Sequence, residues 1–200
     1  CMDYYRIIAD NFQRTIDTIV MSVDPLAEVI ERGGQLMAEA LLADRKIIVC
    51  GNGVDAALAQ LFTCNLLNRF DDDRPALPAL TLGADSASVT AIAQSIGISE
   101  IFSRQLRALG QAGDVLLCIN SSTGTDNLLR ALKTAQERNM GIVMMSNTGD
   151  SEIGSLMRPE DVELRVDATQ PVRIVEIHTM VIHHFCELID HTLFGTHNRD

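Results

Sequence analysis

Hydrophobic residues along the chain follow two spacings, and their alternation predicts the order of the elements. After residue 44, short apolar runs typical of buried strands alternate with segments whose apolar residues recur every three or four positions, as in helices. The expected strands are 46–50, 79–82, 114–119, 141–146 and 162–166, and the expected helices are 54–68, 86–108, 125–138 and 171–192. Near-continuous apolar strands separated by helices predict an α/β fold, a doubly wound parallel sheet covered by helices on both faces.

The first 44 residues show only the helical spacing. Apolar residues recur at helical intervals from Tyr4 to Met21, and Asp24-Pro25 is typical of a helix start, with an N-cap followed by proline at the first helical position. We therefore expect an N-terminal helical hairpin in residues 1–44, with an oligomerisation role, and one α/β domain in residues 45–200. Gly33-Gly34 inside the second helix indicates either a kink or a close helix crossing.

Composition narrows the class of partner and the compartment. The chain has 200 residues, of which 46% are hydrophobic, enough for the core of one domain. A net charge of −11, with only 16 dispersed Lys and Arg residues, argues against direct contact with nucleic acid. Five cysteines without a CxxC pair favour a reducing cytoplasm, and the absence of a run of about 18 apolar residues argues against a membrane span.

Two turns that join a strand to a helix hold the strongest candidate chemistry. Gly51-Asn52-Gly53 follows the first expected strand, and the hydroxyl-rich stretch from Asn120 to Thr125 follows the third. Such turns gather backbone N–H groups, a helix N-terminus and hydroxyls, which together bind phosphate, and loops at the carboxyl ends of parallel strands meet. The predicted phosphate site consists of Gly51, Asn52, Gly53, Ser121, Ser122 and Thr125. The alternative for the second turn is an ordinary helix cap, a role that Ser and Thr also fill.

The last expected helix holds the candidate acid–base groups. Glu176 and His183 are seven residues apart and share one helix face, so a carboxylate and an imidazole could act there as acid and base; the alternative is an exposed polar stripe. His183 and His184 point about 100° apart and cannot chelate one ion from a regular helix, and HExxH is absent, so neither a metal site nor another cofactor is predicted. Leu193 and Phe194 end this helix, either docked on their own domain or exposed for a partner protein.

Several segments carry a resemblance to a known family. They are Gly51-Asn52-Gly53, 67–70, Arg74-Pro75, 105–117, 158–166 and 174–194. Together they resemble the sugar isomerase (SIS) domain family, and more narrowly the group that contains the phosphoheptose isomerases and the DnaA initiator-associating protein DiaA. The resemblance implies a five-stranded parallel sheet of flavodoxin-like order, a homotetramer built partly by the N-terminal helices, and a sugar phosphate held by the second turn.

The positions that match the family's catalytic residues differ in type. The isomerases carry a histidine ligand and a glutamate base where this chain has Leu61 and Asn65, and a glutamine ligand where it has Val175; their catalytic histidine is retained as His183. Asparagine has no basicity near neutral pH, and one remaining ligand cannot hold zinc. Asp55 stands where the family has a phosphate-contacting serine, so it adds a like charge to the anion site.

The leading expectation from the sequence is a cytoplasmic, tetrameric SIS-domain protein that has lost isomerase activity. Such a protein would bind a DnaA-type initiator through Leu193 and Phe194, with several copies of one surface supplying avidity. Two alternatives stay open. One is an altered phosphoheptose isomerase that turns over sedoheptulose 7-phosphate with His183 and Glu176, and the other is a sugar-phosphate sensor.

Overall fold

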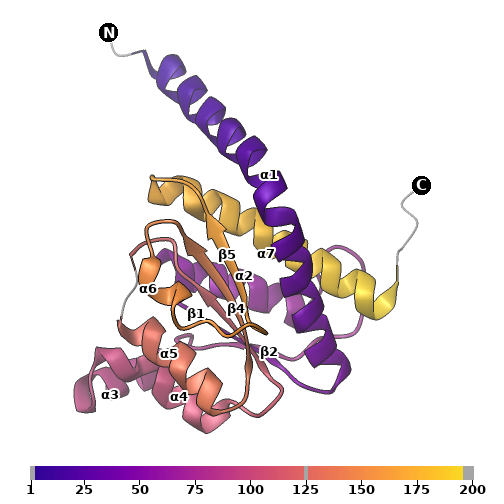
Figure 1. Cartoon of the computed structure of the whole chain (residues 1–200), viewed down its shortest axis with the longest axis vertical. Coiled ribbons are helices and arrows are strands. Elements are labelled where there is room, and N and C mark those ends of the chain that lie inside the picture. Colours follow the sequence, from indigo (N-terminus) through magenta and orange to yellow (C-terminus); the bar gives the residue numbers. More distant parts are fainter. Residues whose placement is uncertain (1–2, 124–125, 196–200) are drawn as a thin grey trace.

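The structure, a computed structural model, describes residues 3–123 and 126–195, and their strands form one all-parallel sheet in the order β2-β1-β3-β4-β5 (Figure 1). The strands are β1 (Ile47–Gly51), β2 (Ala79–Thr81), β3 (Val115–Ile119), β4 (Gly141–Asn147) and β5 (Val162–Val166). The helices are α1 (Tyr4–Leu42), α2 (Val54–Leu67), α3 (Ser86–Ser95), α4 (Ile101–Leu109), α5 (Asp126–Glu137), α6 (Ser151–Gly154) and α7 (Pro171–Phe194), with a 3-10 turn at Ile98–Glu100. The expected α/β class and the five-stranded order are confirmed.

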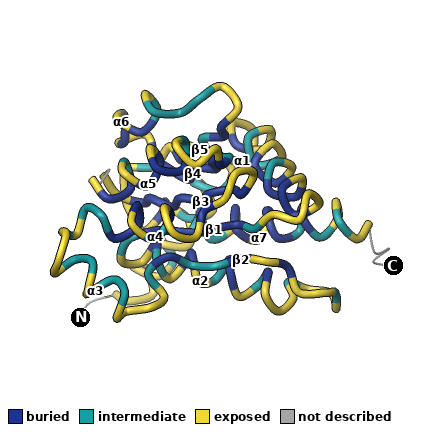
Figure 2. The backbone as a smooth tube through the Cα atoms, turned by 90° about the horizontal axis from the view of Figure 1, so that it is seen from below, coloured by how far each residue is buried: buried dark blue, intermediate teal, exposed yellow. Residues whose placement is uncertain are grey.

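Side chains of each strand alternate between two cores, one on each face of the sheet. On β1, Ile47 and Val49 face a core shared with α1, α2 and α7, whereas Ile48 and Cys50 face a core shared with α4 and α5. Successive side chains of a strand point to opposite faces, so a sheet covered on both sides needs apolar residues at every position. Every residue of β1 and β3 is buried, and Figure 2 shows these strands enclosed between the more exposed helices.

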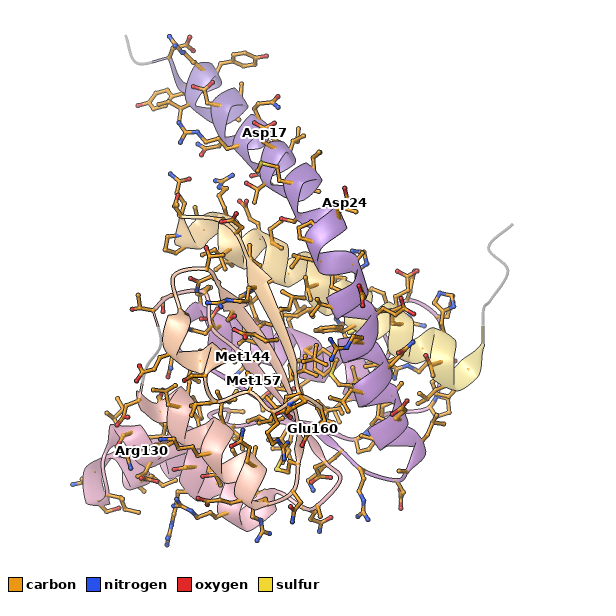
Figure 3. All side chains as sticks on the ribbon, viewed as in Figure 1. Asp17, Asp24, Arg130, Met144, Met157 and Glu160 are labelled. Carbon is orange, nitrogen blue, oxygen red and sulfur yellow. The ribbon has the colours of Figure 1, made fainter. Side chains whose placement is uncertain are left out.

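The expected N-terminal hairpin is wrong: residues 4–42 form one continuous helix. α1 is 39 residues long and contains Pro25 in its interior, where a proline lacks the N–H that would bond to the carbonyl of Met21. All buried residues of α1 follow Pro25, and this second half packs along α7. The N-terminal turns of α1 project beyond the body of the molecule (Figures 1 and 3), whereas Asn11 and Thr15 are hydrogen-bonded to Arg173 and Glu176 of α7. A proline in the interior of a helix costs about 3 kcal/mol, and packing of the second half on α7 offsets this cost so that the helix continues past Pro25.

Gly33 and Gly34 mark a close helix crossing, one of the two options that the sequence left open. A Cβ atom at Gly33 would lie 2.9 Å from Cε1 of Phe185, and one at Gly34 would lie 3.0 Å from Cβ of Leu188. Both contacts are with α7. Only glycine lets the two helix backbones approach this closely.

The remaining differences from the expected elements are small. The helical region 86–108 is divided at Gly97, whose φ of 129° is accessible mainly to glycine. The four-residue α6 was not expected. Among the described residues, no helix is long and apolar enough to cross a membrane.

Candidate functional site

The sheet order places two strand ends at a position where open α/β folds bind ligands. β1 lies between β2 and β3, so the strand order reverses between β1 and β3, and loops at the carboxyl ends of strands diverge around such a switch point. Gly51 at the end of β1 is in register with Ile119 at the end of β3. We call residues 51–53 and 120–123, the described parts of the two predicted turns, the cradle.

Two sets of hydrogen bonds join the halves of the cradle. The backbone N–H of Ser121 donates to Oδ2 of Asp55 at 2.9 Å. The side-chain amides of Asn52 and Asn127 exchange two hydrogen bonds, from Nδ2 of Asn52 to Oδ1 of Asn127 at 2.9 Å and from Nδ2 of Asn127 to Oδ1 of Asn52 at 2.8 Å. The two turns therefore form one structural unit.

The loop after β4 braces the second half of the cradle. Nδ2 of Asn147 donates to the carbonyl of Ser122 at 2.8 Å, and Nδ2 of Asn120 donates to Oδ2 of Asp150 at 2.6 Å. Sequence reasoning missed Asn127, Asn147 and Asp150. A polar residue at the end of a buried strand, as at Asn147, was the available signal.

The predicted phosphate-site residues lie together, with one outside the described residues. A Cβ atom at Gly51 would lie 2.7 Å from the backbone of Asp55, so this close approach requires glycine. Gly53 has a φ of 57° and caps α2. Ser121 is buried and Ser122 is exposed, whereas Thr125 falls outside the described residues.

Asp55 is the most unusual group in the cradle. It is only 3% exposed, and Oδ1 of its carboxylate has no hydrogen-bond partner among the described residues. Burial raises the pKa of Asp55 above its usual range, and its hydrogen bonds with Ser121 lower that pKa by a smaller amount. A carboxylate that is costly to keep ionised thus occupies the Ser121 amide of the predicted phosphate site.

Glu176 and His183 share a helix face, as predicted, but the structure does not bring their side chains together. Seven residues of helix separate them by about 10 Å. Glu176 accepts a hydrogen bond from Oγ1 of Thr15 at 2.9 Å and pairs with Arg173 at 3.3 Å, which ties it to α1. His183 is exposed, and its ring lies 5.7 Å from that of Phe70, centroid to centroid.

His178 is a buried histidine that sequence reasoning did not distinguish from its neighbours. It is fully buried, with Nε2 3.2 Å from the carbonyl oxygen of Ser146, and Nδ1 has no partner among the described residues. Burial lowers the pKa of His178 to about 4. The imidazole is therefore neutral near pH 7, and its Nε2–H donates to that carbonyl.

The zinc ion implied for the isomerases does not fit the residues at the matching positions. The side chains of Leu61 and Val175 are hydrocarbon and pack against the core, so neither can bind a metal. The side chain of Asn65, beside Cys186, is a neutral amide and a weak metal ligand. Over residues 3–123 and 126–195, no three His, Cys, Asp or Glu side chains cluster as a metal site would require.

Leu193 and Phe194, the apolar pair at the end of α7, differ in exposure. Leu193 packs against the core, whereas Phe194 is 38% exposed. Phe194 lines a small pocket of about 40 Å³ together with Phe70, Arg74 and several acidic side chains, including Asp73. Half of the predicted partner-binding pair is thus accessible.

Comparisons with known proteins agree with this fold. The profile of the SIS domain family matches residues 11–147. A phosphoheptose isomerase of Halorhodospira halophila is 44% identical over 97% of this chain and 98% of its own, and one of Alkalilimnicola ehrlichii is 45% identical over 97% and 99%. The structure of phosphoheptose isomerase GmhA from Neisseria gonorrhoeae superposes with a TM-score of 0.89 at 34% identity, covering 94% of this chain and 99% of that one.

These relatives contradict the expectation of a protein that is not an enzyme. That expectation rested on the residue types at Leu61, Asn65 and Val175, whereas the likeness extends over nearly the whole length of relatives that carry an enzyme's name. Identity of 40–45% over nearly the full chain to relatives named as an enzyme outweighs the residue types at three positions. The matched profile, the full-length relatives and the shared fold show that the chain belongs to the SIS domain family.

Proposed function

We propose that this protein is a sugar-phosphate isomerase of the phosphoheptose type, which interconverts the aldose and ketose forms of a seven-carbon sugar phosphate. The observation that carries the proposal is the cradle. Its two turns lie at the switch point of the sheet and are joined by hydrogen bonds between Ser121 and Asp55 and between Asn52 and Asn127. The full-length likeness to proteins named phosphoheptose isomerase supplies the substrate class.

The cradle suits the phosphate end of such a substrate. The turn after β3 meets the N-terminus of α2 at the hydrogen bond between the Ser121 amide and Asp55, and the positive end of a helix favours an anion. Ser122 is exposed in the turn after β3 and offers a hydroxyl. The braces from Asn147 and Asp150 hold the second turn in place, so its donors are ordered in advance of binding.

Isomerisation transfers a proton between adjacent carbon atoms, and among the two predicted acid–base residues His183 is the better candidate. Its imidazole is exposed beside Phe70, whereas the carboxylate of Glu176 is already paired with Arg173 and Thr15. His183 lies beside Phe70, which follows the C-terminal end of α2, whereas the cradle lies at the N-terminal end of this helix, about 20 Å away. A seven-carbon sugar phosphate does not span that distance, so a second copy of the chain must bring its His183 to the cradle.

The test is turnover of sedoheptulose 7-phosphate by the intact protein, followed by NMR of the sugar. We expect an aldose phosphate to accumulate, and His183→Asn to lower kcat by about a hundredfold or more, because general acid–base groups contribute that much. His184→Asn is the matched control: it removes an exposed neighbouring imidazole and should leave kcat unchanged. Absence of conversion at high protein concentration would rule out the proposal.

A second candidate, compatible with the first, is docking of a DnaA-type initiator at the end of α7. The pocket at this end supports such docking. It places the exposed Phe194 beside Phe70, with acidic side chains around Arg74, and an aromatic anchor with a charged rim is typical of binding surfaces. In a homotetramer, four copies of this surface would add avidity. Calorimetric titration with the initiator should show binding that Phe194→Ala abolishes, and an intact protein that shows none would exclude this role.

A further inference from the structure

The carboxylate of Asp55 holds a donor that a phosphate at the cradle would use. Its Oδ2 accepts the hydrogen bond from the Ser121 amide at 2.9 Å. Its Oδ1 is buried and has no partner among the described residues, and the residue as a whole is 3% exposed. The unpaired oxygen calls for an explanation, because buried polar atoms are almost always hydrogen-bonded.

An ionised Asp55 conflicts with a phosphate dianion. The N-terminus of α2 favours negative charge, but two anions at the same amides would repel each other, and burial of Asp55 strengthens that repulsion. One added proton removes the conflict. The neutral carboxyl group gives up the Ser121 amide to the phosphate and itself donates an O–H to a phosphate oxygen.

We propose that Asp55 makes phosphate binding proton-linked, so that the cradle takes a sugar-phosphate dianion together with one proton, which resides on the Asp55 carboxyl group. This inference rests on the proposed function, since it assigns the phosphate to the same cradle. Asp55 thereby determines which charge state of the complex forms. The proton comes from solvent and returns to it when the ligand leaves.

The surroundings of Asp55 favour this protonation. Burial raises the pKa of Asp55 and outweighs the lowering by its hydrogen bonds with Ser121. The ion pairs between described residues do not include Asp55, so no such cation holds it ionised. On β3 beneath it, the thiol of Cys118 interacts with Cys50, Asp55 and Asp150. A hydrogen bond with Cys50, and then burial, raise the pKa of Cys118 well above its usual range, so this thiol stays neutral.

The experiment measures the dissociation constant of sedoheptulose 7-phosphate between pH 7 and 8.5, a range in which a phosphate monoester with a second pKa of about 6 is already a dianion. For the unaltered protein we expect binding to weaken by about tenfold per pH unit, because each unit lowers the protonated fraction of an ionised carboxyl group tenfold. Asp55→Asn keeps an acceptor for the Ser121 amide without a charge. It should bind more tightly at pH 8.5 and show a flat profile.

Asp126→Asn is the matched control, because it removes an exposed carboxylate from the first turn of α5, and it should keep the original slope. Calorimetry of the unaltered protein in two buffers of different ionisation enthalpy should show uptake of about one proton per ligand. A flat profile or no proton uptake in the unaltered protein overturns the inference while leaving the proposed function intact. Proton-linked binding without turnover would instead overturn the isomerase, and no binding by either protein at any pH would overturn both.

Discussion

At the scale of single residues, two buried ionisable side chains give the folded state opposite dependences on pH. The folded pKa of Asp55 is raised, so its contribution to stability is lost as pH rises through that folded pKa. The folded pKa of His178 is lowered to about 4, so the unfolded chain binds the proton more tightly and stability is lost as pH falls from about 6.5 towards 4. His178 therefore acts as an acid-sensitive element in the core.

This difference predicts the acid sensitivity of folding. Between pH 7 and 5, His178 should account for about 2 kcal/mol of the loss in the free energy of unfolding. Over this range the imidazole becomes protonated in the unfolded chain, where its pKa is about 6.5, but stays neutral in the folded core. Urea denaturation of His178→Gln at the two pH values should show a loss smaller by this amount. His184→Gln, which alters an exposed histidine of the same helix, should behave as the unaltered protein does. Equal losses in His178→Gln and the unaltered protein would exclude this role.

At the scale of elements, the α1–α7 crossing shows what local sequence signals can and cannot decide. Asp24-Pro25 has the signature of a helix start, and a preference of this kind is read from a few neighbouring residues. The helix continues because the residues after Pro25 pack on α7, and those contacts are set by residues more than 140 positions away. Gly33-Gly34 was ambiguous for the same reason: its partners Phe185 and Leu188 are close only in the fold.

The crossing predicts a steep penalty for added volume at Gly33. Gly33→Val places methyl groups where even a Cβ lies 2.9 Å from the buried ring of Phe185, so we expect a loss of about 2 kcal/mol or more in the free energy of unfolding from overpacking. Glu39→Val is the control, since it places the same side chain at an exposed position of the same helix and should change stability by about 0.5 kcal/mol or less. Similar denaturation midpoints for the two variants would contradict the close crossing.

At the scale of the whole molecule, the sheet could be predicted from the sequence, whereas the hydrogen bonds that join the two turns of the site could not. The strands are near-continuous apolar runs, and the turns after β1 and β3 carry glycines and hydroxyls, so both could be read from neighbouring residues. The hydrogen bond from Ser121 to Asp55 joins residues 66 positions apart, and the Asn52–Asn127 pair spans 75. Such contacts follow from strand register and sheet order, which local patterns do not specify. The sequence therefore located the cradle and the carboxylate of Asp55 beside it, but not the hydrogen bond by which that carboxylate occupies the Ser121 amide.

The central claim is that the cradle is the phosphate site of a sugar-phosphate isomerase. A crystal structure of the protein grown with sedoheptulose 7-phosphate tests it most directly, because it locates the phosphate atom by atom. We expect a phosphate between the two turns, with an oxygen within hydrogen-bonding distance of the Ser121 amide and another beside a displaced or protonated Asp55. A sugar phosphate bound elsewhere, with the Ser121–Asp55 hydrogen bond unchanged, would show that the cradle is not the phosphate site.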